Sequence, residues 1–282
     1  MNLKDAPWLE GFWAEGPSVG AGILEEIVER HGLLAEWRPD SGLLPSFEAL
    51  EGQAFDPDRV EAQVHAFYEK TAKHSFSVSP TWYSPLFWFA AILIRTTCRL
   101  IDQFNLPLTE AEAGAAMGHD VVRLFNRQGK PVSTCWLRRS GDGEHVVYAG
   151  FYGISHTPDH DEPLVKVVFP VPDGYLCVLL KPTVHPDGGL ELVSSGNGFG
   201  DAGFYWVQRT NQDSAVRVKY VPIEESIRVY VDAENRLQTD HLFYLWGIKF
   251  LALHYDMECR GALQTSSRRR FRSITAAVTR AS

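Results

Sequence analysis

The sequence predicts a mainly β protein of the α+β class, with N-terminal helices packed on a large antiparallel meander. Ten short apolar runs follow one another through the second half of the chain, and clusters of Gly, Pro, Asn and Asp separate them. No run of helical period interrupts the series, so parallel strands joined by crossover helices are not expected. The runs are 132–138, 146–153, 163–171, 175–181, 190–194, 203–209, 215–221, 226–232, 237–244 and 248–257.

Closure of this meander into a lipocalin-like barrel is expected over residues 120–258, because unpaired strand edges invite association with other chains. Val165 and Val167 share one face of their strand, while Leu164 and Val168 share the other. Both faces should therefore be covered, one by the barrel interior and the other by helices. A helix-grip fold is the alternative, but it requires a long amphipathic C-terminal helix that this sequence does not offer.

The region 1–119 is expected to be helical. Residues 20–31 carry apolar side chains at helical spacing and are followed by Gly32, which suits a helix C-cap. Asp56 and Pro57 supply an N-cap residue and a first-turn proline for a second helix. These short amphipathic helices would cover part of the meander.

Residues 86–94 form an unbroken apolar run, and a helix that is apolar all round must lie inside protein or against lipid. The run is too short to span a bilayer, which takes about 20 residues. We expect a helix packed on the barrel or over its mouth. Two alternatives stay open, a membrane-interfacial helix and a self-association face, because Trp82, Tyr83 and Trp88 are side chains typical of membrane interfaces.

The composition is that of an ordinary globular protein, with 282 residues of which 45% are apolar. Four scattered cysteines without a CxxC pair, and an N-terminus without a secretion signal, indicate a cytoplasmic protein with reduced thiols. The formal net charge of −8 argues against nucleic acid as a partner. Residues 259–282 carry six arginines and no acid, so we expect a basic, flexible, solvated tail. The alternative is that this tail touches a polynucleotide or an anionic membrane surface, the latter together with residues 86–94.

His241 and His254 are the candidate catalytic residues, with Asp240 as a supporting carboxylate. The short connection around Trp246 and Gly247 predicts that the two histidines lie on adjacent antiparallel strands. An acid/base pair would form if both side chains share a face, which strand alternation alone does not decide. For each histidine, a structural role in the core is the simpler alternative.

The candidate ligand-binding residues are polar side chains that interrupt apolar strands or flank the apolar stripe of the second helix. Inside a barrel they would bind the polar part of a ligand, whereas Lys166 at the rim would merely reach solvent. The candidates are Lys166, Arg228, Tyr230, Tyr148, Tyr152 and Tyr68.

Two loops contain residue types of known sites without the necessary spacing. The loop HTPDHDE at 156–162 matches no zinc pattern, and a solvated hairpin tip explains it equally well. The glycine-rich stretch at 194–204 does not open a helix after a parallel strand, so it is not a phosphate loop. The sequence therefore predicts no metal and no cofactor.

Three stretches resemble a family of uncharacterised bacterial proteins that includes the soluble portion of YndJ-like membrane proteins. They are AFYEKT at 66–71, FGDAGFYWV at 199–207 and TDHLFYLWGIKFLALHY at 239–255. The resemblance implies a shared ligand-binding or structural module near membranes, in a free-standing version without the transmembrane helices of that family. It carries over no catalytic residue.

Three functions follow as hypotheses. The first is binding of a hydrophobic or amphipathic small molecule in a barrel cavity. The second is an acid/base cyclase, isomerase or hydratase that acts on a lipid- or terpenoid-like substrate. The third is a non-catalytic docking module at the membrane periphery. A cavity with convergent titratable groups would favour the enzyme, whereas a filled interior would leave the docking module.

Overall fold

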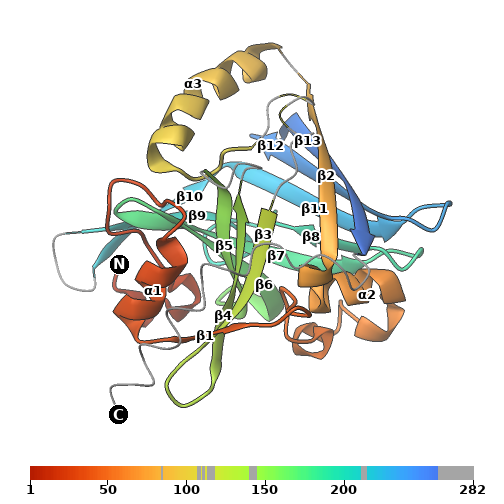
Figure 1. Ribbon diagram of the computed structural model, residues 1–282, viewed down its shortest axis with the longest axis horizontal. Coiled ribbons are helices and arrows are strands. Elements are labelled where there is room, and N and C mark those ends of the chain that lie inside the picture. Colours follow the sequence, from red (N-terminus) through yellow and green to blue (C-terminus); the bar gives the residue numbers. More distant parts are fainter. Residues whose placement is uncertain are drawn as a thin grey trace.

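The strands form one 13-stranded sheet in which every ladder between the named strands is antiparallel (Figure 1). The computed structural model describes residues 1–83, 85–106, 109, 112, 118–139, 145–210 and 215–259. The strands are β1 (Leu34–Trp37), β2 (His74–Trp82), β3 (Gly118–Phe125), β4 (Pro131–Arg139), β5 (Val146–Thr157), β6 (His160–Val171), β7 (Gly174–Val184), β8 (Leu190–Val193), β9 (Gly203–Arg209), β10 (Val216–Val221), β11 (Ile223–Val231), β12 (Leu237–Leu245) and β13 (Ile248–Cys259).

The N-terminal region contributes strands as well as helices. The order in the sheet is β1-β3-β4-β5-β6-β7-β8-β11-β12-β13-β2, and β9 pairs with both β7 and β10 beside this path. Two strands from the region expected to be helical therefore stand at its two ends. The three α-helices are α1 (Ile23–His31), α2 (Ala62–Glu69) and α3 (Pro85–Ile101).

The structure confirms the predicted end of α1 but begins the second helix later than predicted. Gly32 ends α1 in the left-handed region with φ of 59°, as a C-cap glycine should. The Asp56 side chain accepts a hydrogen bond from the Asp58 amide, and Pro57 opens a short 3-10 turn. The helix α2 begins only after that turn, at Ala62.

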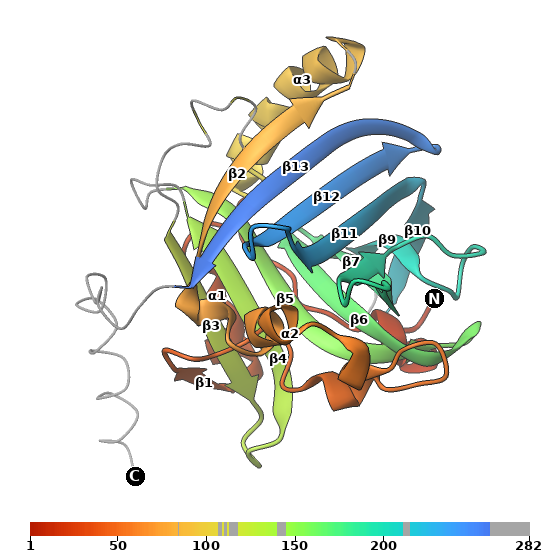
Figure 2. The same ribbon diagram turned by 90° about the vertical axis from the view of Figure 1, so that its right-hand side faces the viewer.

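The predicted closed barrel is corrected by the strand order, because β1 and β2 end the path and do not pair with each other. Figure 2 shows that the sheet nevertheless curls until β2 and β13 face the strands β3 to β5. No backbone ladder joins β2 to β3, and we call this junction the seam. One edge of β3 pairs with β4, and on its other edge Val122 to Phe125 pair with β1. On the edge directed toward β2, residues 118–121 of β3 have no backbone ladder.

Side chains join the two ends of the sheet across this seam. The ring Nε2 of His119, on β3, lies 2.8 Å from the carbonyl oxygen of His74 at the start of β2. The Trp136 indole donates to Nδ1 of the same histidine at 3.2 Å, which makes Nε2 the donor to the carbonyl. Phe76 of β2 packs on Trp136 with ring centroids 5.4 Å apart.

A buried arginine lies at the centre of this seam. Arg138, on β4, is only 2% exposed and sits over the rings of Phe76, Trp136, Tyr148 and Tyr255 at 5.3 to 5.6 Å. These rings come from four different strands. Burial disfavours the charge, yet Tyr148 and Tyr255 outweigh it and raise the pKa of Arg138. The cation thus stays charged inside the protein, with its stabilisation coming from ring faces and tyrosine hydroxyls.

Two hydrophobic cores lie on the two faces of the sheet. The inner core fills the curl and includes Val165 and Val178 from the sheet and Phe47, Phe67 and Tyr68 from the segment 43–68. The outer core lies between the strands β3 to β7, β9 and β10 and the N-terminal residues, whose helix α1 buries its apolar side there. The strands β6 and β7 are apolar on both faces because both cores use them.

The helix α3 is held at both ends. The Tyr83 amide before it donates to the Phe250 carbonyl at 3.1 Å, and Phe87 packs on the Phe250 ring at 5.5 Å. Behind its C-terminus the buried Gln103 side chain bonds the backbone of Ala149 and Pro170. Figure 1 shows α3 as an arch over one end of the curled sheet, as expected for the apolar run 86–94.

We expect Arg138→Met to lower the free energy of unfolding by about 2–4 kcal/mol, because the cation holds four strands through desolvated ring faces. Arg123→Met is the matched control, since Arg123 lies over the single ring of Phe125 and is partly exposed. This control should cost about 1 kcal/mol or less. Urea denaturation measures both values, and equal midpoints for the two variants would contradict the role given to Arg138.

Candidate functional site

His241 and His254 lie on adjacent strands but on opposite faces of the sheet. In the ladder of β12 and β13, His241 faces Leu253 and His254 faces Asp240. Leu253 belongs to the inner core, so His241 points inward and His254 outward. The shared face that an acid/base pair requires is absent, and the two imidazoles cannot act on one bound molecule.

The outward pair is an exposed ion pair. Nδ1 of His254 lies 2.8 Å from a carboxylate oxygen of Asp240, and both side chains are more than two fifths exposed. In such a setting solvent screens the interaction strongly. The predicted contact between Asp240 and a catalytic histidine is thus formed, but on the solvated face of the sheet.

The inward histidine has a carboxylate partner that the sequence did not suggest. Nε2 of His241 lies 2.8 Å from an oxygen of Glu225, whose side chain is only 8% exposed. Glu225 sits one strand away, on β11, and its backbone amide donates a hydrogen bond to the Ser194 hydroxyl oxygen at 2.7 Å. Alternation along β11 places Glu225 in phase with the inner residues Ile227 and Val229, which is the signal that could have found it.

Three of the candidate tyrosines do lie inside the curl. Tyr148 and Tyr152 project inward from β5, and Tyr68 projects from α2. Burial raises the pKa of all three, so they are neutral hydrogen-bonding groups at physiological pH. Of the three, Tyr148 contacts Arg138, a buried cation that no pattern in the sequence indicated.

Lys166 does not face the interior. In the ladder of β6 and β7, Lys166 lies opposite Leu179, which belongs to the outer core. Lys166 is therefore on the outer face, beneath the N-terminal residues. Burial lowers the pKa of Lys166, while Cys177 and Glu10 act in the opposite direction. The interpretation of Lys166 as an interior ligand group is wrong because the apolar neighbours of β6 occupy both faces and alternation alone could not orient the strand.

Arg228 and Tyr230 also point outward, in contrast to their predicted place inside the barrel. Arg228 pairs with Asp187 at 2.5 Å and lies over the Tyr230 ring at 5.0 Å. Their neighbours Ile227 and Val229 take the inner positions instead. Both residues therefore belong to a solvated polar face that extends over β8, β11, β12 and β13.

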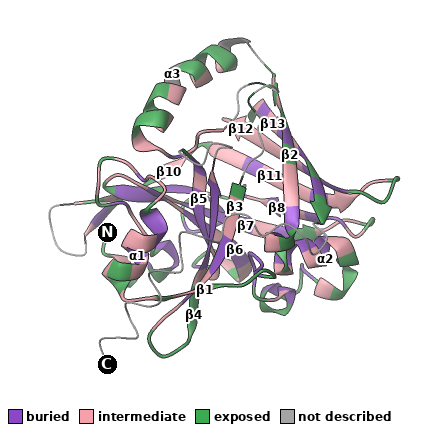
Figure 3. Cartoon of the chain, in the orientation of Figure 1, coloured by how far each residue is buried: buried purple, intermediate pink, exposed green. Residues whose placement is uncertain are grey.

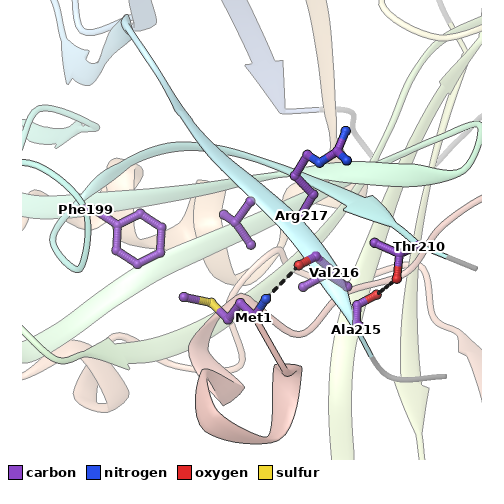
Figure 4. Close-up of a pocket in the computed structure, with 7 residues that line it drawn as sticks. Met1, Phe199, Thr210, Ala215, Val216 and Arg217 are labelled. Carbon is purple, nitrogen blue, oxygen red and sulfur yellow. Dashed lines mark hydrogen bonds between the residues drawn. The ribbon is translucent and has the colours of Figure 1, made fainter. Parts of the chain in front are cut away.

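Two pockets lie outside the interior. One, of about 660 Å³, is shown in Figure 4 beside the N-terminus, where the Met1 amine donates to the Val216 carbonyl and Phe199 forms a wall. It is shallow and has few polar groups that converge on one point. The other, of about 640 Å³, lies between α2 and the ends of β12 and β13. Among the described residues, no three His, Cys, Asp or Glu side chains are placed to hold a metal ion.

A third candidate is an apolar surface at the end of the sheet where α3 lies. We call it the end surface, and its exposed side chains are Tyr83, Trp88, Phe89, Ile92, Leu100, Trp246 and Ile248. Phe89 is 60% exposed and Leu100 72% exposed, and with Ile92 they recur at helical spacing along one side of α3. Figure 3 shows the exposed residues along this helix.

The turn between β12 and β13 presents Trp246 in an unusual way. Trp246 and Gly247 form a two-residue turn in which both φ angles are positive, 50° and 74°. Such turns favour Asn and Gly, and a bulky residue there is strained. The Trp246 side chain is 74% exposed, so no packing compensates the strain. A strained, exposed tryptophan points to a function for the indole outside the fold itself.

The charged residues of α3 are all basic. The helix α3 contains Arg95 and Arg99 and no acidic residue, although the chain as a whole has a net charge of −8. Arg95 pairs with Glu112, and Lys249 lies over the Tyr83 ring at 4.0 Å. None of the helices in the described residues is long and apolar enough to cross a bilayer.

The chain is similar to a protein of Bacillus subtilis strain 168 described as uncharacterized membrane protein YndJ, which supports the resemblance to YndJ-like proteins. The two are 24% identical over 229 residues, which cover 77% of this chain and 38% of the relative. The chain thus spans well under half the length of that relative. No family model matches the sequence, and no solved structure matches it.

A double-mutant comparison tests the assignment of the two histidines to opposite faces. Glu225 with His241 and Asp240 with His254 are both carboxylate–imidazole pairs across neighbouring strands, and they differ in exposure. The coupling energy should be about 1.5–3 kcal/mol for the inner pair. It should be about 0.5 kcal/mol or less for the outer pair. Chemical denaturation of the single and double variants measures both, and a larger coupling for the outer pair would overturn the assignment.

Proposed function

We propose that this protein docks on the surface of an anionic lipid bilayer through its end surface. One observation supports the proposal most: large apolar side chains of α3 and of the β12–β13 turn are exposed together at one end of the sheet. A soluble monomer seldom exposes a group of this size without a use for it. The part of the interior around Arg138, in contrast, is occupied by the rings of Phe76, Trp136, Tyr148 and Tyr255.

The side-chain types favour a bilayer over a protein partner. Trp88, Trp246 and Tyr83 are residues that collect at the membrane–water interface, where an apolar ring meets polar head groups. Arg99 and Lys249 add positive charge at the same end of an otherwise acidic protein. This charge complements anionic lipids and turns the end surface, rather than any other face, toward the membrane.

The attachment of α3 suits this use. Its two ends are bonded to the sheet through Tyr83 and Gln103, so the helix keeps its exposed side in a fixed direction. A helix lying in the membrane plane buries its apolar side about 5–10 Å into the boundary of head groups and acyl chains. The similarity to a protein described as a membrane protein is compatible with this placement.

Flotation with vesicles of phosphatidylcholine and phosphatidylglycerol tests the proposal. The wild-type protein should float with the vesicles, and Phe89→Glu should reduce the bound fraction about tenfold because a carboxylate enters the interface. Leu34→Glu is the matched control, since Leu34 is exposed on β1, away from the end surface, and should change nothing. Failure of the wild type to float with either charged or neutral vesicles would refute the proposal.

A second candidate function is lipocalin-like binding of an amphipathic molecule against the inner face. It is favoured by inner side chains near α3 that stay partly exposed, among them Tyr148, Tyr152, Phe169, Ile227 and Phe243. An acyl chain could lie on the apolar members while Arg138 and the tyrosine hydroxyls attract a carboxylate. The acid/base alternative has no comparable support, since its two histidines are on opposite faces.

Neighbouring residues of β12 provide the test of this second candidate. Phe243→Glu places a carboxylate on the inner face and should weaken binding of a dansyl-labelled fatty acid about tenfold, measured by fluorescence titration. Leu242→Glu places the same group on the outer face and should leave the affinity unchanged. Equal effects of both variants, or no saturable binding by the wild type, would exclude the inner face as a fatty-acid site.

A further inference from the structure

The inner side chains of β12 change from buried to accessible in the direction of α3. Leu237, at the start of the strand, is only 5% exposed. His241, Phe243 and Leu245, which follow at alternate positions, are each partly exposed. The strand then ends in the turn with Trp246, which belongs to the end surface. An accessible strip of the inner face therefore runs from His241 toward the surface that is proposed to dock on a bilayer.

A carboxylate–imidazole pair lies on this strip. Nε2 of His241 is 2.8 Å from a carboxylate oxygen of Glu225, and the two side chains are 17% and 8% exposed. The Phe243 ring lies against the imidazole, with ring centroids 4.1 Å apart. The Ser194 hydroxyl accepts a hydrogen bond from the Glu225 backbone amide. These contacts hold the imidazole ring and the backbone that carries the carboxylate.

The second ring nitrogen of His241 is free to meet a bound molecule. An ionised carboxylate only accepts hydrogen bonds, so in the neutral imidazole the proton lies on Nε2 and Nδ1 carries a lone pair. Among the described residues no group bonds Nδ1, and this atom keeps accessible surface. An imidazole that is oriented by a carboxylate and open to a ligand is the usual arrangement of a general base.

Tyr152 adds a neutral hydroxyl to the same face of the sheet. Burial raises the pKa of Tyr152 well above its ordinary value of 10.0, and Tyr148 and Glu225 act in the same direction. The effect of Glu225 means that this carboxylate lies within electrostatic range of the phenol. The hydroxyl therefore stays protonated and can donate to a carbonyl oxygen that gains negative charge during a reaction.

We propose that His241, with Glu225 behind it, hydrolyses carboxylic esters of long-chain fatty acids. Nδ1 of His241 takes a proton from a water molecule, and the water oxygen attacks the carbonyl carbon of the ester. The bond between that carbon and the alcohol oxygen then breaks, and Nδ1 returns its proton to the alcohol. The products are the fatty acid and the alcohol. Glu225 is a positioning residue, which keeps the other proton on Nε2 and stabilises the imidazolium.

The lining and the location of the strip indicate the substrate. From His241 to Trp246 the strand extends over about 17 Å, and the apolar side chains along it suit an acyl chain. A neutral ester also places no anion beside Glu225. Glycerolipids of a bilayer are esters of this class and lie at the end surface when the protein is docked. This source of the substrate rests on the proposed docking function, whereas the chemistry at His241 does not.

Release of p-nitrophenol from two esters tests the site in the full chain without a membrane. The kcat/KM for p-nitrophenyl decanoate should exceed that for p-nitrophenyl acetate at least about tenfold, because the longer acyl chain binds along the strip. Absence of turnover, or an equal kcat/KM for the two esters, would overturn the proposal.

Variants of two similar pairs distinguish this site from a general effect of surface imidazoles. His241→Gln should lower kcat about a hundredfold, and Glu225→Gln should lower it about tenfold with KM unchanged. His185 and Glu191 form the same kind of pair at 2.8 Å on the outer face. The controls His185→Gln and Glu191→Gln should change neither constant.

Equal kcat values for the inner and the outer variants would refute the role of His241. Thermal unfolding checks that all four variants are folded, and the comparison of the two esters decides alone if one of them is not. Vesicle flotation of His241→Gln should match that of the wild type. Docking and ester hydrolysis can therefore fail separately, since flotation measures the first and p-nitrophenol release the second.

Discussion

The architecture depends on one constraint: the sheet curls far enough to bring its ends together, yet backbone hydrogen bonds do not close it. A closed barrel removes its edges through a continuous ladder. Here Arg138 and the rings around it take that role, with a bond from His119 to the backbone of β2 beside them. A guanidinium suits this position because its flat, weakly hydrated cation can contact several ring faces at once.

Closure by side chains, without a backbone ladder, affects which residues lie on the inner and outer faces of the sheet. Side chains fill the seam around Arg138, whereas inner side chains nearer α3, among them Tyr152 and Phe243, stay partly exposed. The charged and polar residues of β11 to β13 are directed to the solvated outer face, where Arg228, Asp240 and His254 form ion pairs. Features that suggest function therefore lie toward the end of the strands where α3 is attached, on the end surface and on the inner face beside it.

For most of the candidate residues, the sequence predicted the strand but not which face of the sheet the side chain occupies. The turn at Trp246 and Gly247 correctly indicated that His241 and His254 are on neighbouring strands. Their assignment to opposite faces follows from register, and a shift of one residue would have reversed it. Lys166 was misplaced for the same reason, since β6 is apolar on both faces and offers no contrast between inside and outside. Glu225 and Arg138 are partners from distant strands, and no local pattern marks them.

The sequence by itself determined the series of antiparallel strands, the apolar helix over 86–94 and the C-cap of α1, because turn residues, side-chain period and capping act within a few neighbouring residues. It also showed that this helix needed a cover or a partner. The tertiary structure alone decided that β1 and β2 join the sheet, that the ladder stays open, and that α3 leaves one side exposed. Those outcomes depend on contacts between residues far apart in the chain, and their free energies appear only when the whole sheet has curled.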